Sequence, residues 1–327
     1  KTPMAKSITK RTLIGFKNLT INAHYLDDLI NMMKNKPKQI TDRLLKPSYW
    51  KKEGVKEMRF DAVVGNPPYQ ESGGSGGTSD SPVYQYFAEA AFKTNASYTS
   101  LIMPSRWYAG GRENLLGKFR KNMLNNRSVR KLITYDDSHD VFPAVEIKGG
   151  LCIYLTDVSY DGDCEYILIS DNYKDIRMRN LGEFDILIKY PVLAIIVKKV
   201  MTKNNGCSTV ETIISNDKTF GISTNPKESK KNPIKVYETA TALHNTKLFY
   251  IDKSKRKIEY ISKEIILKNA DMIETEKVFI PSGYGAGEKF PHQILGLPEY
   301  AGSNSVCSQS FMYASFSTGL EAKNFII

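Results

Sequence analysis

The chain has 327 residues, enough for two domains that each bury a sizeable core. No apolar run approaches the roughly 18 residues that a membrane span needs, and the 4 cysteines have neither metal-site spacing nor the density of a secreted disulfide framework. The formal net charge of +11 favours a polyanionic partner, although basic runs of this kind are often only solvated faces. We therefore expect a protein of the reducing cytoplasm with no membrane segment.

The first part of the chain mixes short patterns with polar connections. Residues 19–26 alternate like a strand, and residues 27–33 continue with helical spacing. Residues 34–57 are polar, rich in lysine and interrupted by proline, which indicates a surface excursion. An apolar run predicts a strand over residues 58–65. Residues 72–80, rich in Gly and Ser, are either a flexible linker or a mobile active-site loop.

The next stretch alternates helix and strand. A helix is expected over residues 82–93, with Pro82 in its first turn and Ser81 as its cap. Apolar runs predict strands over residues 98–103, 129–135 and 150–155, and helical spacing recurs over residues 112–124. This alternation predicts an α/β fold with a parallel or mixed sheet. Beyond about residue 165, short alternating runs broken by Gly, Asn and Lys predict a second, β-rich domain.

The tetrapeptide Asn66-Pro67-Pro68-Tyr69 suits the methylation of an exocyclic aromatic amine. Such an amine is a poor nucleophile because its lone pair is delocalised into the ring. The side-chain carbonyl of Asn66 and the backbone carbonyl of Pro67 can each accept one N–H bond and aim that lone pair at a methyl donor. Proline has no N–H to compete and locks φ, and the ring of Tyr69 can stack on a base removed from its duplex.

A plain turn followed by a core aromatic residue is the alternative interpretation of the tetrapeptide. The predicted strand immediately before it favours the catalytic interpretation, because open α/β sheets bind their ligands at the carboxyl ends of strands.

Four later stretches follow the tetrapeptide in order, at residues 82–87, 102–107, 141–143 and 147–150. Together these residues resemble the gamma-type N6-adenine DNA methyltransferases of restriction–modification systems, in particular the methylase region of bifunctional restriction-and-modification enzymes. The resemblance spans residues 20–157. It implies a Rossmann-like methyltransferase sheet with an incomplete N-terminal part over residues 1–165. A β-rich target-recognition domain, truncated at its C-terminus, would then occupy residues 166–327.

The resemblance also implies the reaction. A methyl group would pass from S-adenosylmethionine to N6 of an adenine flipped out of double-stranded DNA, with no metal needed for the transfer. Asn66, Pro67, Pro68 and Tyr69 would form the catalytic motif, and Tyr69 would stack on the base. Phe142 would pack on the base from another side; a core Phe that anchors its own loop is equally compatible with the sequence.

The cofactor site is only partly represented in the sequence. By the same resemblance, Gly65 and Asn66 would contact S-adenosylmethionine. An acidic residue is expected just after the first strand, and we assign this position to Asp27 rather than to His24 or Asp28; a solvated acid at a helix start is the alternative. The glycine-rich cofactor loop of the family, Asp-Pro-x-x-Gly-x-Gly, does not occur in residues 1–20. With the non-Met start and the apolar end, this absence leads us to expect a fragment of a longer polypeptide.

Other functions remain open from the sequence. The fragment could act only as a DNA-binding module, or the same motif could methylate RNA or a protein glutamine. Asp140 with Glu146 and Lys148 fits a nuclease pattern formally, but we expect any nuclease or helicase segment elsewhere on the same or a partner chain. The 4 histidines have no ligand spacing, so no metal site is predicted. Candidate phosphate contacts are basic residues in the second half, namely Lys253, Lys255, Arg256 and Lys257.

Overall fold

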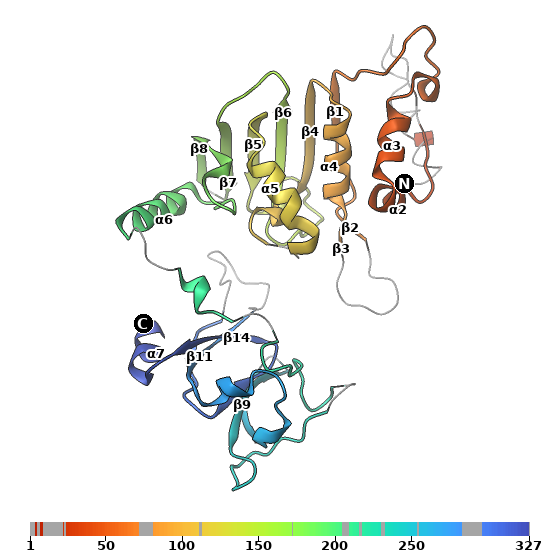
Figure 1. The fold of residues 1–327 in the computed structure, drawn as a ribbon. Coiled ribbons are helices and arrows are strands. Elements are labelled where there is room, and N and C mark those ends of the chain that lie inside the picture. Colours follow the sequence, from red (N-terminus) through yellow and green to blue (C-terminus); the bar gives the residue numbers. More distant parts are fainter. Residues whose placement is uncertain are drawn as a thin grey trace. The chain divides into compact units, whose positions relative to one another are not determined.

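The computed structural model describes residues 4, 7, 8, 22, 24–71, 81–110, 113–171, 173–204, 209–215, 218–229, 233–253, 255–282 and 296–326. The chain divides into two compact units, Lys1–Asn204 and Asn205–Ile327, here called unit 1 and unit 2 (Figure 1). The boundary expected after residue 165 differs from this division, because it falls inside a strand of the unit 1 sheet. The glycine-rich stretch 72–80 and most of the strand expected over 19–26 lie outside the described residues.

Unit 1 is built on a six-stranded sheet in the order β1-β4-β6-β5-β7-β8 (Figure 1). Strand β1 is parallel to β4, β5 is parallel to β7, and β6 runs antiparallel between β4 and β5. Strand β8 is antiparallel to β7 at the far edge. The expected mixed α/β sheet is confirmed. The strands are β1 (Ala62–Gly65), β4 (Tyr98–Pro104), β5 (Val129–Tyr135), β6 (Leu151–Asp157), β7 (Cys164–Ser170) and β8 (Tyr173–Arg179).

Helices pack against this sheet through apolar side chains. Helix α4 contributes Ala88 and Ala91 to the core, and α5 contributes Phe119 and Met123. Trp107 is fully buried at the centre, with its ring centroid 5.8 Å from that of Phe119. The helical segments of unit 1 are α2 (Leu29–Asn35), α3 (Pro37–Leu44), η1 (Pro47–Trp50), α4 (Tyr84–Lys93), η2 (Ser105–Tyr108), η3 (Glu113–Gly117), α5 (Lys118–Leu124), η4 (Ser138–Asp140), η5 (Leu181–Glu183) and α6 (Pro191–Lys203).

Two local expectations are corrected by the structure. Residues 34–57, expected to be a surface excursion, contain α3, which buries Ile40 against Met33 and Ala90. Proline at the first helical position begins this helix instead of breaking it. Ser81 and Pro82 do not start α4, because they form strand β3 (Ser81–Pro82) paired with β2 (Gln70–Glu71). Within the described residues, no helix is long and apolar enough to cross a membrane.

Unit 2 contains two small sheets around a shared apolar cluster. The first has the order β10-β9-β13 and the second β12-β11-β14. Phe249 of the first and Phe279 of the second meet at 4.9 Å between ring centroids. The elements are η6 (Val210–Thr212), β9 (Thr246–Asp252), β10 (Lys255–Ile261), η7 (Lys263–Ile265), η8 (Ala270–Glu274), β11 (Glu276–Pro281), β12 (Glu299–Tyr300), β13 (Ser305–Cys307), β14 (Phe311–Phe316) and α7 (Gly319–Ile326).

Candidate active site

One edge of the unit 1 sheet collects the stretches that the sequence singled out. Strands β1, β4, β5 and β7 all point the same way, so their carboxyl ends lie at this edge. Residues 66–69 follow β1, residues 105–107 follow β4, and residues 141–143 lie in the loop after β5. Residues 147–150 come directly before β6, which starts at the same edge because it is antiparallel. The arrangement is the one in which open α/β sheets bind ligands.

Asn66 lies at this edge and is exposed to solvent. Within the described part of the chain, its side-chain amide makes no hydrogen bond. Pro67 beside it is buried, and Gly65 before it pairs with Leu101 in the sheet. A buried proline with a locked φ, two residues after the end of a paired strand, restricts how its carbonyl can move. The edge therefore presents one free amide and one rigid carbonyl side by side.

Tyr69 is partly exposed, with its hydroxyl turned inward. The phenolic oxygen is buried and has no hydrogen-bond partner among the described residues. Burial raises the pKa of this phenol to about 12, with a smaller contribution from nearby Cys152. The ring therefore stays neutral at physiological pH. The backbone carbonyl of Tyr69 accepts a hydrogen bond from the N–H of Val83 at 3.1 Å, which ties the motif to the start of α4.

Phe142 is half-buried in the loop between β5 and β6. Ser138 closes this loop internally: its hydroxyl donates to the carbonyl of Val145 at 2.8 Å and accepts from the N–H of Ile147 at 2.8 Å. At the loop's end, buried Ser105 donates its N–H to the carbonyl of Gly150 at 3.1 Å. The sequence indicated residues 102–107 and 147–150 as separate motifs, and it did not predict that Ser105 joins them.

The candidate cofactor acids have different surroundings. Asp27 is exposed, and its carboxylate accepts a hydrogen bond from the phenol of Tyr25, which raises the pKa of Tyr25. His24 stacks on Tyr49 at 4.0 Å between ring centroids. Asp28 accepts a hydrogen bond from the amide of Asn31 at 2.7 Å. None of the described interactions joins Asp27 to the tetrapeptide, so its cofactor role stays a prediction.

Comparison with known proteins shows what the first part of the chain is similar to. Residues 1–142 match the model of the family described as Eco57I restriction-modification methylase. A protein of Mycoplasma pneumoniae described as an uncharacterized adenine-specific methylase is 36% identical over 107 residues, which are 32% of this chain and 25% of that protein. The resemblance expected from the motifs is confirmed, and the chain spans about a quarter of the length of this curated relative.

Solved structures similar to this chain come from restriction–modification systems. The match to the type IIG restriction endonuclease BpuSI covers 81% of this chain and 42% of the BpuSI chain, with 14% identity and a TM-score of 0.32. The match to a modification subunit of a putative type I restriction enzyme from Vibrio vulnificus YJ016 covers 53% of this chain and 37% of that subunit, with 11% identity and a TM-score of 0.27.

The candidate DNA contacts lie outside the methylase region, on the β9–β10 hairpin of unit 2. All four side chains belong to exposed residues. Arg256 donates to the carbonyl of Leu297 at 2.9 Å and lies 3.6 Å from a carboxylate oxygen of Glu299. Lys257 lies 3.7 Å from a carboxylate oxygen of Asp252. Lys253 and Lys255 have no ion-pair partner in the described part of the chain. These two lysines are therefore more available for contacts with phosphates than Arg256 and Lys257.

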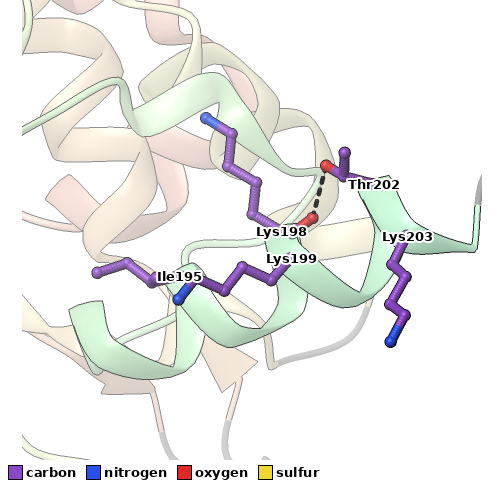
Figure 2. A pocket seen from close by; sticks show the side chains of 5 residues that line it. All are labelled: Ile195, Lys198, Lys199, Thr202 and Lys203. Atoms are coloured by element: carbon purple, nitrogen blue, oxygen red, sulfur yellow. Dashed lines mark hydrogen bonds between the residues drawn. The ribbon is translucent and has the colours of Figure 1, made fainter.

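The structure gives no support to a metal site or to the formal nuclease pattern. Among the described residues, no group of three or more His, Cys, Asp or Glu side chains could hold a metal ion. The formal nuclease residues Asp140, Glu146 and Lys148 are all exposed. An open hollow runs along α6, where the hydroxyl of Thr202 donates to the backbone carbonyl of Lys198 (Figure 2). Its lining contains no acid and no residue of the tetrapeptide: Ile195, Lys198, Lys199, Thr202 and Lys203.

Proposed function

We propose that this chain contributes the catalytic centre of an adenine-specific DNA methyltransferase of a restriction–modification system. The single observation that carries the proposal is Asn66, exposed and free of hydrogen bonds within the described residues, directly after β1 and beside buried Pro67. It lies inside the stretch that matches the restriction-modification methylase family. The match to an adenine-specific methylase favours N6 of adenine as the acceptor.

The residues of the edge suit the activation of an aromatic amine. The Oδ1 atom of Asn66 and the carbonyl of Pro67 accept the two N–H bonds of the amine and hold its nitrogen nearer to sp3 geometry. Tyr69 and Phe142, both partly exposed, offer two ring faces to a purine taken out of the duplex. After transfer, the amine nitrogen carries an extra proton, which passes to solvent water at this exposed position.

S-adenosylmethionine, when bound, supplies an electrophilic methyl group on a sulfonium centre. Two residues at the edge fit one side of such a ligand, because Gly65 has no side chain to block the approach and Asn66 offers a free amide. Asp27, which the resemblance implies for the cofactor, has an exposed carboxylate. Because the thioether that departs is neutral and stable, the chemistry of the transfer needs no metal ion.

Unit 2 is proposed as the part that recognises the target sequence in double-stranded DNA. Its basic hairpin and the net charge of +11 favour a polyanion. Nuclease or helicase segments of the same or a partner chain would complete a restriction–modification system, with the cytoplasm as the place of action. The assignment of a methyltransferase domain and a target-recognition domain, expected from the sequence over residues 1–165 and 166–327, remains part of this proposal, with the boundary moved to the division after Asn204.

The decisive experiment follows tritiated methyl transfer from S-adenosylmethionine to plasmid DNA, with RNA and protein substrates in parallel. We expect the wild-type chain to label DNA, and Asn66→Ala to lower the rate by roughly 10²–10³-fold, as for the loss of one transition-state hydrogen bond. Asn324→Ala, which removes another exposed amide, is the matched control and should keep the rate. Equal labelling by Asn66→Ala contradicts the proposal. DNA binding without calorimetric heat from S-adenosylmethionine would make the chain a binding module instead.

A further inference from the structure

Asp136 and Lys189 form a partly buried ion pair at the same sheet edge as the tetrapeptide. Asp136 follows β5 and Lys189 precedes α6, and their side chains are only 14% and 21% exposed. The second carboxylate oxygen of Asp136 accepts a hydrogen bond from the phenol of Tyr190 at 2.7 Å. The backbone N–H of Asp136 donates to the carbonyl of Ile169 at 2.9 Å. The carboxylate is therefore held on the sheet, and it holds the ammonium group in turn.

The ammonium group of Lys189 reaches a second acceptor. It donates to the backbone carbonyl of Gly149 at 3.1 Å, and the hydroxyl of Ser105 donates to the same carbonyl. Gly149 is the last residue but one of the loop that begins after β5. Lys189 and Ser105 thus hold the end of this loop from two directions. Lys189 comes from the segment before α6, and Ser105 comes directly after β4.

The loop transmits its position to Phe142 because it is cross-linked within itself. The N–H of Phe142 donates to the carbonyl of Ser138 at 2.8 Å, and the N–H of Val145 donates to the carbonyl of Phe142 at 3.0 Å. Ser138 is 2% exposed and also binds Val145 and Ile147 through its hydroxyl. A loop cross-linked in this way moves as one body. The contacts at Gly149, where the loop returns to the sheet, therefore set the position of the Phe142 ring.

We infer that Lys189, held by Asp136, is a positioning residue that fixes the loop over residues 137–149 and thereby the ring of Phe142 against an extruded purine. The inference rests on the proposed function. Lys189 makes no described contact with the tetrapeptide; it acts through the carbonyl of Gly149. Nothing in the local sequence around Lys189 signals this role, because its partners come from two distant segments.

Amide hydrogen exchange on the full chain tests the anchoring itself, independent of any activity. In Lys189→Met, which keeps the apolar stem and removes the charge, peptides covering residues 137–149 should exchange about tenfold faster than in the wild type. Lys131→Met is the matched control, because Lys131 pairs with Glu165 at 2.8 Å on β5 and β7, away from the loop. Lys189→Arg should restore protection. Unchanged exchange in Lys189→Met overturns the inference.

A double-mutant cycle tests whether the anchoring acts through Phe142. Lys189→Met should lower kcat for plasmid methylation about ten- to a hundredfold, as expected for a misplaced group, and leave the calorimetric affinity for S-adenosylmethionine unchanged. In a Phe142→Ala background, Lys189→Met should add no further loss. Additive losses, or an unchanged kcat, overturn the positioning role. A wild-type chain that methylates no DNA sinks the proposed function and the positioning role with it, while hydrogen exchange still decides the anchoring.

Discussion

Gly150 adopts a left-handed backbone conformation, with φ at +82°, where the loop after β5 returns to the sheet. A Cβ atom there would lie 2.1 Å from the carbonyl oxygen of Tyr135 and 2.7 Å from that of Asp136. Neighbouring Gly149 also has a positive φ, at +88°, but a Cβ there would meet nothing within 4 Å. The two glycines therefore separate backbone strain from steric collision within one turn.

We expect Gly150→Ala to destabilise unit 1 by at least about 2 kcal/mol, because strain and collision add. Gly149→Ala should cost only about 1 kcal/mol, from strain alone. Urea unfolding followed by tryptophan fluorescence measures this difference in unit 1, since both tryptophans, Trp50 and Trp107, belong to it. Similar losses for the two variants would show that the loop does not press on β5 as described.

Strand β11 and the short helix η8 before it are joined by a buried cation. Lys277 is fully buried, and its ammonium group donates to the carbonyls of Met272, Ile273 and Thr275 at 2.9, 2.8 and 2.6 Å. Burial lowers the pKa of Lys277 from 10.5 to about 8, against the opposing effect of nearby carboxylates. A neutral amine has two N–H donors for three acceptors, so deprotonation leaves one carbonyl unpaired.

The lowered pKa of Lys277 fixes the sign of a pH effect on unit 2. Below about pH 8 both folded and unfolded chains carry the charge, and the folded chain bears the full cost of burying it. Between about pH 8 and 10.5 the unfolded chain binds a proton that the folded chain does not, so folding stability rises with pH. Calorimetry should show the unit 2 transition moving up in temperature from pH 8 to 10 relative to Lys277→Met. A parallel shift in both proteins would contradict the assignment.

At the scale of the whole molecule, the charge of +11 favours association with a polyanion, and the proposed binding to DNA should therefore depend on salt. If Lys253 and Lys255 contact phosphates, the double variant Lys253→Gln/Lys255→Gln should reduce the log–log salt slope of binding by about 2. Arg256→Gln/Lys257→Gln on the same hairpin should change the slope less, because those side chains already face Glu299 and Asp252. Fluorescence anisotropy with a labelled duplex measures both slopes. An unchanged slope in the first variant removes that pair as phosphate contacts.

The amino-acid sequence by itself determined those elements whose pattern is local and strong. The strand expected over residues 129–135 is β5, and those expected over 98–103 and 150–155 correspond to β4 and β6, because continuous apolar runs bounded by turns need no distant partner to be recognised. The order of the short motifs that follow β1 carried the resemblance to restriction–modification methylases, which the match over residues 1–142 confirms. Helix α3 could not be predicted, since Pro37 and the polar residues around it mask Ile40, the apolar residue that the helix buries.

Only the tertiary structure decided which strands are neighbours and which side chains meet. Apolar periodicity states that a strand is buried, but not that β6 lies antiparallel between β4 and β5, and that placement brings Ser105 to Gly150. The pairing of Asp136 with Lys189 likewise joins a strand end to the approach of α6. These contacts depend on the order of the whole sheet, which no local stretch of residues encodes.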